Sequence, residues 1–340
     1  MLAKRFFYVC AGPLCLAVGA ILPAVAGAQA PPYLTQWGTF GTGPGQFETP
    51  VGVTVDNAGN VYVVETDGNR IQKFTSSGGY ITQWGSYGSG NGNFNWASGL
   101  AVDASANVYV ADTQNSRIQK FTSNGGYITQ WGSLGAGNGQ LYNPTSVAVD
   151  ASSNVYVADF YNNRVQVFTS NGTYLSQFPT SGVRPVDRHP DGVAVDAAGN
   201  IYVTLSSTAP GFIQKFTSSG ALLLQWGTLG TGDGQFSAAT RAAVDAADNV
   251  YVVDWGNCRI QVFTGGGVYL TQWGTVGTGP GQFLNPIGVA VNRNGDVYVA
   301  DTNNERIQVF GPVPTPTVTQ SWGGVKARYR PNAPATPQDK

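Results

Sequence analysis

The sequence predicts an all-β fold, a six-bladed β-propeller of four-stranded antiparallel blades closed by the N-terminal strand. A repeat of 47 residues, or 48 in one case, occurs six times, and its anchors, each followed by Trp or Phe, are Gln36, Gln83, Gln130, Gln177, Gln225 and Gln272. Gly (46 residues) and aromatic residues (12%) are abundant, as expected for short strands joined by tight turns. A fixed period of this size is typical of supersecondary units that bury their apolar faces against their neighbours.

One repeat contains four predicted strands. In residues 50–85, apolar runs at 51–55 and 61–64 are followed by an alternating run at 70–74 and a more polar run at 80–84. Asn and Gly between the runs favour tight turns. The first two runs are apolar on both faces, so we expect them near the axis, while the fourth suits an outer edge. Six such sheets packed radially form a propeller.

The points within the repeat at which the array begins and ends predict how the ring closes. Residues 33–37 match a fourth strand, whereas the sixth repeat ends at Phe310 after three strands. We therefore expect residues 33–37 to complete the sixth blade. Residues 317–322 carry a second copy of the anchor pattern and are the competing candidate.

Residues 1–28 have the pattern of a secretory signal peptide. Lys4 and Arg5 precede a largely apolar run, and Ala26-Gly27-Ala28 supplies the small residues of a cleavage site before Gln29. This predicts a secreted or periplasmic bacterial protein without a transmembrane segment after cleavage. A retained membrane anchor and a lipoprotein anchored at Cys15 are the alternatives.

The remaining chain is divided into a propeller at 29–311 and a Pro-rich, basic tail at 312–340. The tail is expected to be a linker and end piece, with surface retention or sorting as a hypothesis. Without the leader, Cys258 is the only thiol, which leaves no intramolecular disulfide. The 16 basic and 19 acidic side chains that remain give a formal charge of −3, which does not favour nucleic-acid binding. We expect a monomer.

The repeat resembles the NHL repeat. In the last copy, Pro286-Ile287-Gly288-Val289-Ala290-Val291 is followed by a V-Y-V-A-D segment at 297–301 and an R-I-Q-V-F segment at 306–310. These segments recur in register over roughly residues 33–311. The resemblance implies a six-bladed propeller. It also implies that enzymatic six-bladed relatives, lyases and lactonases among them, use histidines or acidic side chains at the channel mouth.

Five repeats place an acid at the end of the second strand and an arginine five residues later. A carboxylate and a guanidinium across a short loop are suited to a bidentate ion pair, although a ring of carboxylates could also hold a metal. The ion-pair interpretation is favoured because both residues are missing together from the fourth repeat. The pairs are Glu65–Arg70, Asp112–Arg117, Asp159–Arg164, Asp254–Arg259 and Asp301–Arg306.

The expected channel mouth is poor in ionisable groups. The first residues of the inner strands are Val51, Ser98, Thr145, Asp191, Thr240 and Ile287. His189 is the only histidine, so a multi-histidine zinc site is excluded, and one carboxylate does not supply the oxygens that calcium needs. We therefore expect no metal and no cofactor, and the balance is against an enzyme.

The fourth repeat is the irregular one. The segment 184–191 replaces a Gly-rich connection, and Arg241 stands in the next repeat where Gly is usual. Arg184, Arg188 and Arg241 are candidate ligands for an anionic group, with His189 and Asp191 as a candidate catalytic acid–base couple. The alternative is a divergent blade whose charges satisfy one another.

Aromatic residues gather on the connections of one face, at Trp96, Tyr142, Phe160, Tyr161 and Trp255. They could form a platform for sugar rings or extended peptide, or they could cover the rim of the core. The favoured hypothesis is a non-catalytic scaffold that binds protein, peptide or glycan. A hydrolase or lyase with a blade-four site and a purely structural envelope protein are the alternatives.

Overall fold

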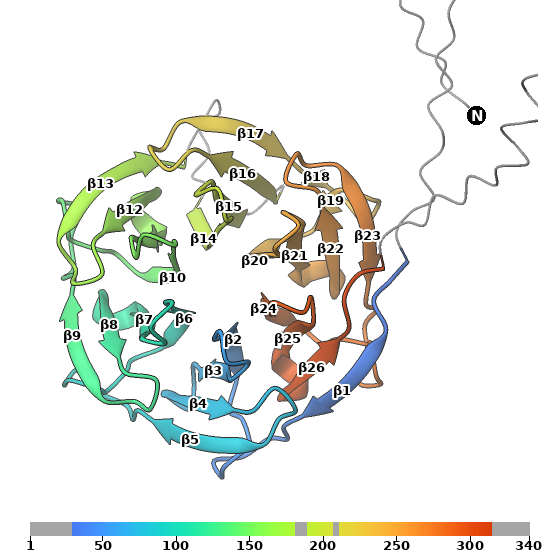
Figure 1. Cartoon of the computed structure of the whole chain (residues 1–340), viewed down its shortest axis with the longest axis horizontal. Coiled ribbons are helices and arrows are strands. Elements are labelled where there is room, and N and C mark those ends of the chain that lie inside the picture. The colour runs from blue at the N-terminus through green and yellow to red at the C-terminus, as the bar shows by residue number, and fades with distance from the viewer. Residues whose placement is uncertain (1–28, 181–188, 207–210, 315–340) are drawn as a thin grey trace, which may run out of the picture. The chain divides into compact units, whose positions relative to one another are not determined.

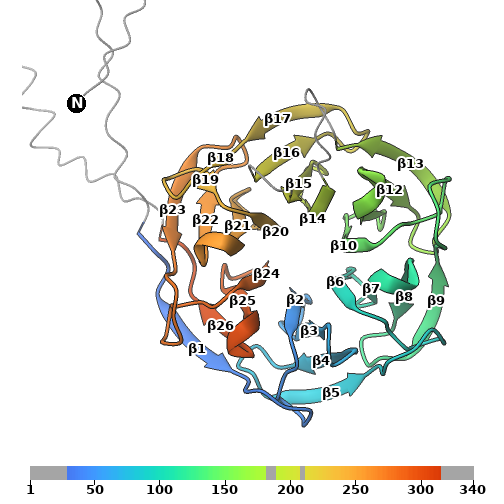
Figure 2. The same cartoon turned by 180° about the vertical axis from the view of Figure 1, so that it is seen from behind.

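A computed structural model describes residues 29–180, 189–206 and 211–314, and residues 29–314 belong to one compact unit. Six four-stranded antiparallel sheets are arranged around a central axis, as the two opposite views show (Figure 1, Figure 2). The predicted all-β six-bladed propeller is confirmed. Where the structure describes the chain, it contains no helix whose length and apolar character would suit a membrane span.

Each blade runs from an inner strand to an outer strand in sequence order. Blade 1 contains β2 (Pro50–Val55), β3 (Val61–Glu65), β4 (Arg70–Phe74) and β5 (Tyr80–Trp84). Blade 2 contains β6 (Ala97–Val102), β7 (Val108–Asp112), β8 (Arg117–Phe121) and β9 (Tyr127–Trp131). Blade 3 contains β10 (Pro144–Val149), β11 (Val155–Asp159), β12 (Arg164–Phe168) and β13 (Tyr174–Pro179).

The second half of the ring repeats the same order. Blade 4 contains β14 (His189–Val195), β15 (Ile201–Ser206), β16 (Phe212–Phe216) and β17 (Leu222–Trp226). Blade 5 contains β20 (Ala239–Val244), β21 (Val250–Asp254), β22 (Arg259–Phe263) and β23 (Tyr269–Trp273). Blade 6 contains β24 (Pro286–Val291), β25 (Val297–Asp301), β26 (Arg306–Phe310) and β1 (Tyr33–Trp37).

Short elements occur in the connections. Within the described residues, four 3-10 helices join second to third strands, namely η1 (Thr113–Asn115), η2 (Phe160–Asn162), η3 (Trp255–Asn257) and η4 (Thr302–Asn304). A two-stranded parallel sheet of β18 (Thr228–Leu229) and β19 (Gln235–Phe236) lies between blades 4 and 5.

The N-terminal strand closes the ring. β1 pairs antiparallel with β26, with Thr35 opposite Val309 and Trp37 opposite Ile307, so the first described strand completes the last blade (Figure 1). This confirms closure by residues 33–37. The competing segment, residues 317–322, lies outside the described residues.

Blade interfaces are built from the anchor aromatic of one blade and a turn glycine of the next. Gly78 has a φ of +87°, and a Cβ placed on it would lie 2.6 Å from Cδ2 of Trp37. Neither the conformation nor the contact leaves room for a side chain. Trp84 packs on Gly125 in the same way, and Trp131 packs on Gly172. The recurring Trp and Gly therefore specify how adjacent blades stack.

Candidate functional site

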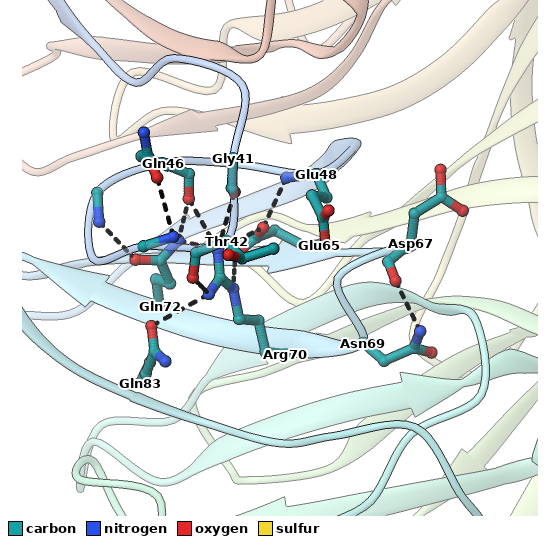
Figure 3. A network of polar contacts seen from close by, with 12 residues as sticks. Gly41, Thr42, Gln46, Glu48, Glu65, Asp67, Asn69, Arg70, Gln72 and Gln83 are labelled. Carbon is teal, nitrogen blue, oxygen red and sulfur yellow. Dashed lines mark hydrogen bonds and ion pairs between the residues drawn. The ribbon is translucent and has the colours of Figure 1, made fainter.

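The acid and the arginine of each regular blade form a buried ion pair that also holds the outer-to-inner connection. In blade 1, Arg70 Nε lies 2.8 Å from Glu65 Oε1 and Arg70 Nη2 lies 3.2 Å from Glu65 Oε2 (Figure 3). The guanidinium also donates to the carbonyls of Thr42 and Gln46. Glu65 Oε2 accepts the N–H of Glu48 at 2.8 Å. One buried pair thereby anchors the Gly-rich loop.

The predicted bidentate geometry is right for blade 1 and wrong for the other four pairs. In blade 2, only Arg117 Nε contacts Asp112 Oδ2, at 2.7 Å, and both Nη atoms face loop carbonyls. The reason is that aspartate is one methylene shorter than glutamate, since Asp112 Oδ1 accepts the N–H of Asn95 at 2.8 Å just as Glu65 accepts that of Glu48. Arg117 Nη1 also donates to Gln130 Oε1 at 2.7 Å, which explains the recurring anchor glutamine.

These carboxylates have structural partners and no exposed surface. The five acids of the pairs are 0% exposed. Burial raises the pKa of Glu65, although hydrogen bonds from Arg70, the Glu48 N–H and Gln72 oppose the rise. Among the described residues, no group of three or more His, Cys, Asp or Glu side chains is arranged to hold a metal ion. The ion-pair interpretation of the ring of acids is therefore the correct one.

Blade 4 replaces the ion pair with an apolar pair. Leu205 lies opposite Phe212 in the register that Asp159 and Arg164 occupy in blade 3. Leu205 is 1% exposed, and Phe212 packs against the same core cluster. In the regular blades the anchor glutamine accepts from the arginine, as Gln130 does from Arg117, whereas the anchor Gln225 accepts from Gln214 Nε2 at 2.9 Å. Among its described residues, blade 4 thus lacks the ion pair that anchors the Gly-rich connection of a regular blade.

His189 belongs to an aromatic cluster rather than to a charged couple. Its ring stacks on Phe160 at 4.5 Å between centroids, and its Nδ1 lies 3.0 Å from the Phe160 carbonyl oxygen. Tyr161 contacts the imidazole edge-on at 5.5 Å, and Tyr142 lies 4.8 Å from Tyr161. We call Tyr142, Phe160, Tyr161 and His189 the aromatic cluster. It joins blade 3 to blade 4.

The cluster is accessible where its two tyrosines meet. Tyr142 is 44% exposed and Tyr161 is 47% exposed. Tyr142 lies on the outer-to-inner connection of blade 3, and Tyr161 lies in η2. A hydrogen bond of 3.2 Å from the Tyr161 N–H to the Tyr142 carbonyl fixes the two loops together. The structure therefore presents two aromatic faces on a rigid base.

Asp191 and Arg241 form a second, separate unit at the channel. Arg241 Nη1 lies 2.7 Å from Asp191 Oδ1 and also binds the Asp191 carbonyl, while Nη2 donates to the Thr145 carbonyl at 2.7 Å. The Arg241 side chain is 10% exposed, and its Nε is buried without a partner among the described residues. This arginine ties blades 3, 4 and 5 together beside a channel cavity of about 50 Å³.

The remaining predicted residues are not brought to these two units. Within the described residues, no hydrogen bond or ring contact joins His189 to Asp191, because each has a different partner. Trp96 is 54% exposed and Trp255 is 39% exposed, and among the described rings neither lies against another. Arg184 and Arg188 lie outside the described residues.

A ring of apolar side chains on the connections was not anticipated from the sequence. These side chains all follow the anchor tryptophan by three residues, and they are 55–71% exposed: Phe40, Tyr87, Leu134, Leu229 and Val276. We call them the connection tips. Their constant position in the repeat was a signal that could have revealed them. The place of His189 among the aromatic residues could have been found in the same way, because His189 occupies the repeat position of Trp96.

The ring of six sheets and the exposed aromatic residues on its connections define the class of protein, a six-bladed propeller with an aromatic surface. The family model for the NHL repeat matches residues 47–74, 94–121, 141–168, 236–263 and 283–310. The protein is therefore an NHL-repeat six-bladed β-propeller. The irregular blade 4 lies between the third and fourth matches.

Solved structures share this architecture at low sequence identity. A streptogramin B lyase has a TM-score of 0.57 and 13% identity, covering 82% of this chain and 97% of that chain. An inactive virginiamycin B lyase from Staphylococcus aureus with quinupristin has a TM-score of 0.55 and 15% identity, covering 79% and 82%. A protein of unknown function from Bacteroides thetaiotaomicron has a TM-score of 0.64 and 18% identity, covering 82% and 76%. At these identities the likeness shows the fold alone. No curated protein sequence is matched.

Proposed function

We propose that the protein is a non-catalytic binding scaffold for protein, peptide or glycan ligands. The observation that carries the proposal is the aromatic cluster, in which two half-exposed tyrosines are held by a backbone hydrogen bond and backed by a stacked histidine. Rigid aromatic side chains supply contact area at low cost in conformational entropy. The connection tips add exposed apolar surface to the same set of loops.

The titratable groups support binding over chemistry. His189 stacks on Phe160 and is in contact with its carbonyl, while Asp191 is paired with Arg241. A general acid–base couple requires a nucleophile or a proton donor within reach of its base. Each candidate group here already has a structural partner.

The proposal is tested by screening the full-length protein on peptide and glycan arrays. Replacing Tyr142 and Tyr161 together with Ala should weaken binding of the hits at least tenfold, because truncation of central aromatic residues costs the most at interfaces. Tyr80→Ala is the matched control, since Tyr80 is 39% exposed and lies on an outer strand. Equal binding by the double variant would refute the site.

A hydrolase or lyase is the second candidate. The observation that favours it is the convergence of Asp191 and Arg241 from two blades at the channel, in a fold shared with streptogramin B and virginiamycin B lyases. Asp191→Asn should then abolish turnover of a cyclic peptide or lactone substrate while leaving array binding unchanged. Absence of turnover by the wild-type protein removes this candidate.

We also propose export, on the basis of the leader pattern that ends at Ala28. In a bacterial host, cell fractionation should find the protein in the periplasm or medium, with Gln29 as its N-terminal residue. An intact Met1 on cytoplasmic protein would contradict this proposal.

A further inference from the structure

A groove of about 430 Å³ lies between blades 3 and 4, on the face opposite the aromatic cluster. Its walls are the first turn of blade 3, with Asp150, and the last turn of blade 4, with Ser218. Tyr156 and Val167 also line it, side by side on adjacent strands. We call this groove the blade 3–4 slot.

The equivalent space between blades 2 and 3 is filled by a lysine of the protein itself. Lys120 stands at the repeat position of Val167, and its Nζ donates to the Ser170 carbonyl of the next blade at 3.1 Å. The ammonium lies 4.9 Å from the centroid of the Tyr109 ring and 4.0 Å from Asp103 Oδ2. A carboxylate, an aromatic ring and a turn carbonyl thus surround one cation.

One other interface uses the same arrangement, and a second shares its ring and its turn carbonyl. Lys215 donates to the Gly265 carbonyl at 3.0 Å, lies over the Tyr202 ring at 4.9 Å and is 3.7 Å from Asp196. Lys73 donates to the Ser123 carbonyl of blade 2, and its Nζ lies 5.1 Å from the centroid of the Tyr62 ring. The carbonyl and ring contacts therefore recur wherever the third strand carries lysine, and Lys120 and Lys215 also have a carboxylate within 4.0 Å.

The blade 3–4 slot keeps the surroundings and lacks the lysine. Tyr156 donates to Asp150 Oδ2 at 3.1 Å, as Tyr109 does to Asp103. Asp150 is partly exposed, and among the described residues no cationic side chain pairs with it. The turn of Ser218 corresponds to the turn of Ser170 that accepts Lys120. Phe178, moreover, replaces the bulkier anchor tryptophan at this interface.

The other interfaces without a lysine are closed differently. Between blades 5 and 6, Val313 packs against the cluster that contains Tyr251 and Val262. Between blades 6 and 1, the acid and the amide of the turn exchange places, since Asn292 Nδ2 donates to Asp296 at 2.9 Å, and the Tyr298 hydroxyl lies 3.5 Å from the Ser76 carbonyl oxygen. The slot between blades 3 and 4 combines the acid with open space.

We propose that the blade 3–4 slot binds a primary alkylammonium group from outside the chain, in the position that Lys120 occupies one blade earlier. Asp150 supplies the counter-charge, the Tyr156 ring supplies a cation–π face, and the Ser218 carbonyl accepts a hydrogen bond. The ligand class is a lysine side chain of a partner or a free amine of similar length.

The experiment uses n-butylamine, which has the carbon chain and the ammonium of a lysine side chain. Ligand-observed NMR on the full-length protein should detect its binding, whereas 1-butanol, which has the same chain and no charge, should bind at least tenfold more weakly. Equal binding of the two compounds would show an apolar cleft and overturn the proposal.

Three variants locate the site. Val167→Lys should abolish butylamine binding, because the new side chain fills the slot. Asp150→Asn should weaken binding at least tenfold and still fold, since Asn292 forms the same turn in blade 6. Lys120→Val should raise the stoichiometry from one site to two. Unchanged binding by Val167→Lys would place the amine elsewhere and refute the assignment.

The source of the ammonium is determined by competition. Nα-acetyl-lysine methylamide and cadaverine are each titrated against bound butylamine. Stronger displacement by the lysine derivative indicates a protein partner, and stronger displacement by cadaverine indicates a free amine. Failure of both to displace butylamine would contradict the proposed site.

Discussion

Blades 2 and 4 contain the same four strands, but they place opposite chemistry at the point where the second strand pairs with the third. Blade 2 buries the Asp112–Arg117 pair, which binds loop carbonyls and the anchor Gln130. Blade 4 places Leu205 opposite Phe212 and forms no such pair among its described residues. Both solutions satisfy the core, since a buried ion pair and a well-packed apolar pair can be similar in stability.

The difference between the blades shows where variation is tolerated. An arginine that binds several carbonyls at once requires a loop of fixed shape, so the five regular connections are nearly identical. Blade 4 has no such arginine and its preceding connection carries a different sequence, while β14 places His189 against blade 3 and Asp191 at the channel. The candidate sites arise where the repeat is broken.

The largest expected effect comes from breaking the pair of blade 2. Arg117→Ala leaves Asp112 buried without a counter-charge, which should lower the free energy of unfolding by about 3–5 kcal/mol. The denaturant midpoint measures the loss. Asp112→Leu with Arg117→Phe copies blade 4 and should lose less, because both charges are removed. A larger loss in the double variant would mean that the two blades are not interchangeable.

Removing the channel arginine should have a smaller effect. Arg241→Gly restores the residue of most blades and removes hydrogen bonds to Asp191 and Thr145, at a cost of roughly 1.5–3 kcal/mol. A double-mutant cycle with Asp191→Asn should show coupling, since the two side chains are in direct contact. Additive losses in thermal denaturation would disprove the coupling.

The inter-blade lysine should contribute less again. Lys120→Val converts the blade 2–3 interface into a copy of the blade 3–4 slot and should cost about 1–2 kcal/mol, the value of a partly desolvated cation–π contact. Added butylamine should recover part of the loss in a thermal shift assay. Recovery by 1-butanol to the same degree would show that charge is irrelevant.

The exposed tyrosines should matter least for stability. Tyr161→Ala should change the free energy of unfolding by less than ~1 kcal/mol, because the side chain is half exposed and lies outside the core. Circular dichroism melting measures this change, alongside the array binding that the same substitution should weaken. A large destabilisation would indicate that the aromatic cluster serves as core cover instead.

The 47-residue repeat made the fold predictable, and the position of each residue within the repeat made much of the site predictable. The spacing of Gln36 and its copies defines six blades, and the entry of the chain at a fourth strand defines closure by β1. The pairing of acid and arginine also follows from their joint loss in blade 4. The geometry of that pairing was not predicted. Both Glu65 and Asp112 accept a backbone N–H from the connection, and only the longer glutamate also reaches a second guanidinium nitrogen.

The sequence by itself determined the blade, its turns and the ring, because these depend on neighbours in the chain and on a pattern repeated six times. Only the tertiary structure decided which side chains meet across blades. His189 joined Phe160 and not Asp191, and Val167 left a slot where Lys120 fills its interface. The physical reason is that such contacts form between residues 29 to 50 positions apart, whose distance is set by how two blades pack.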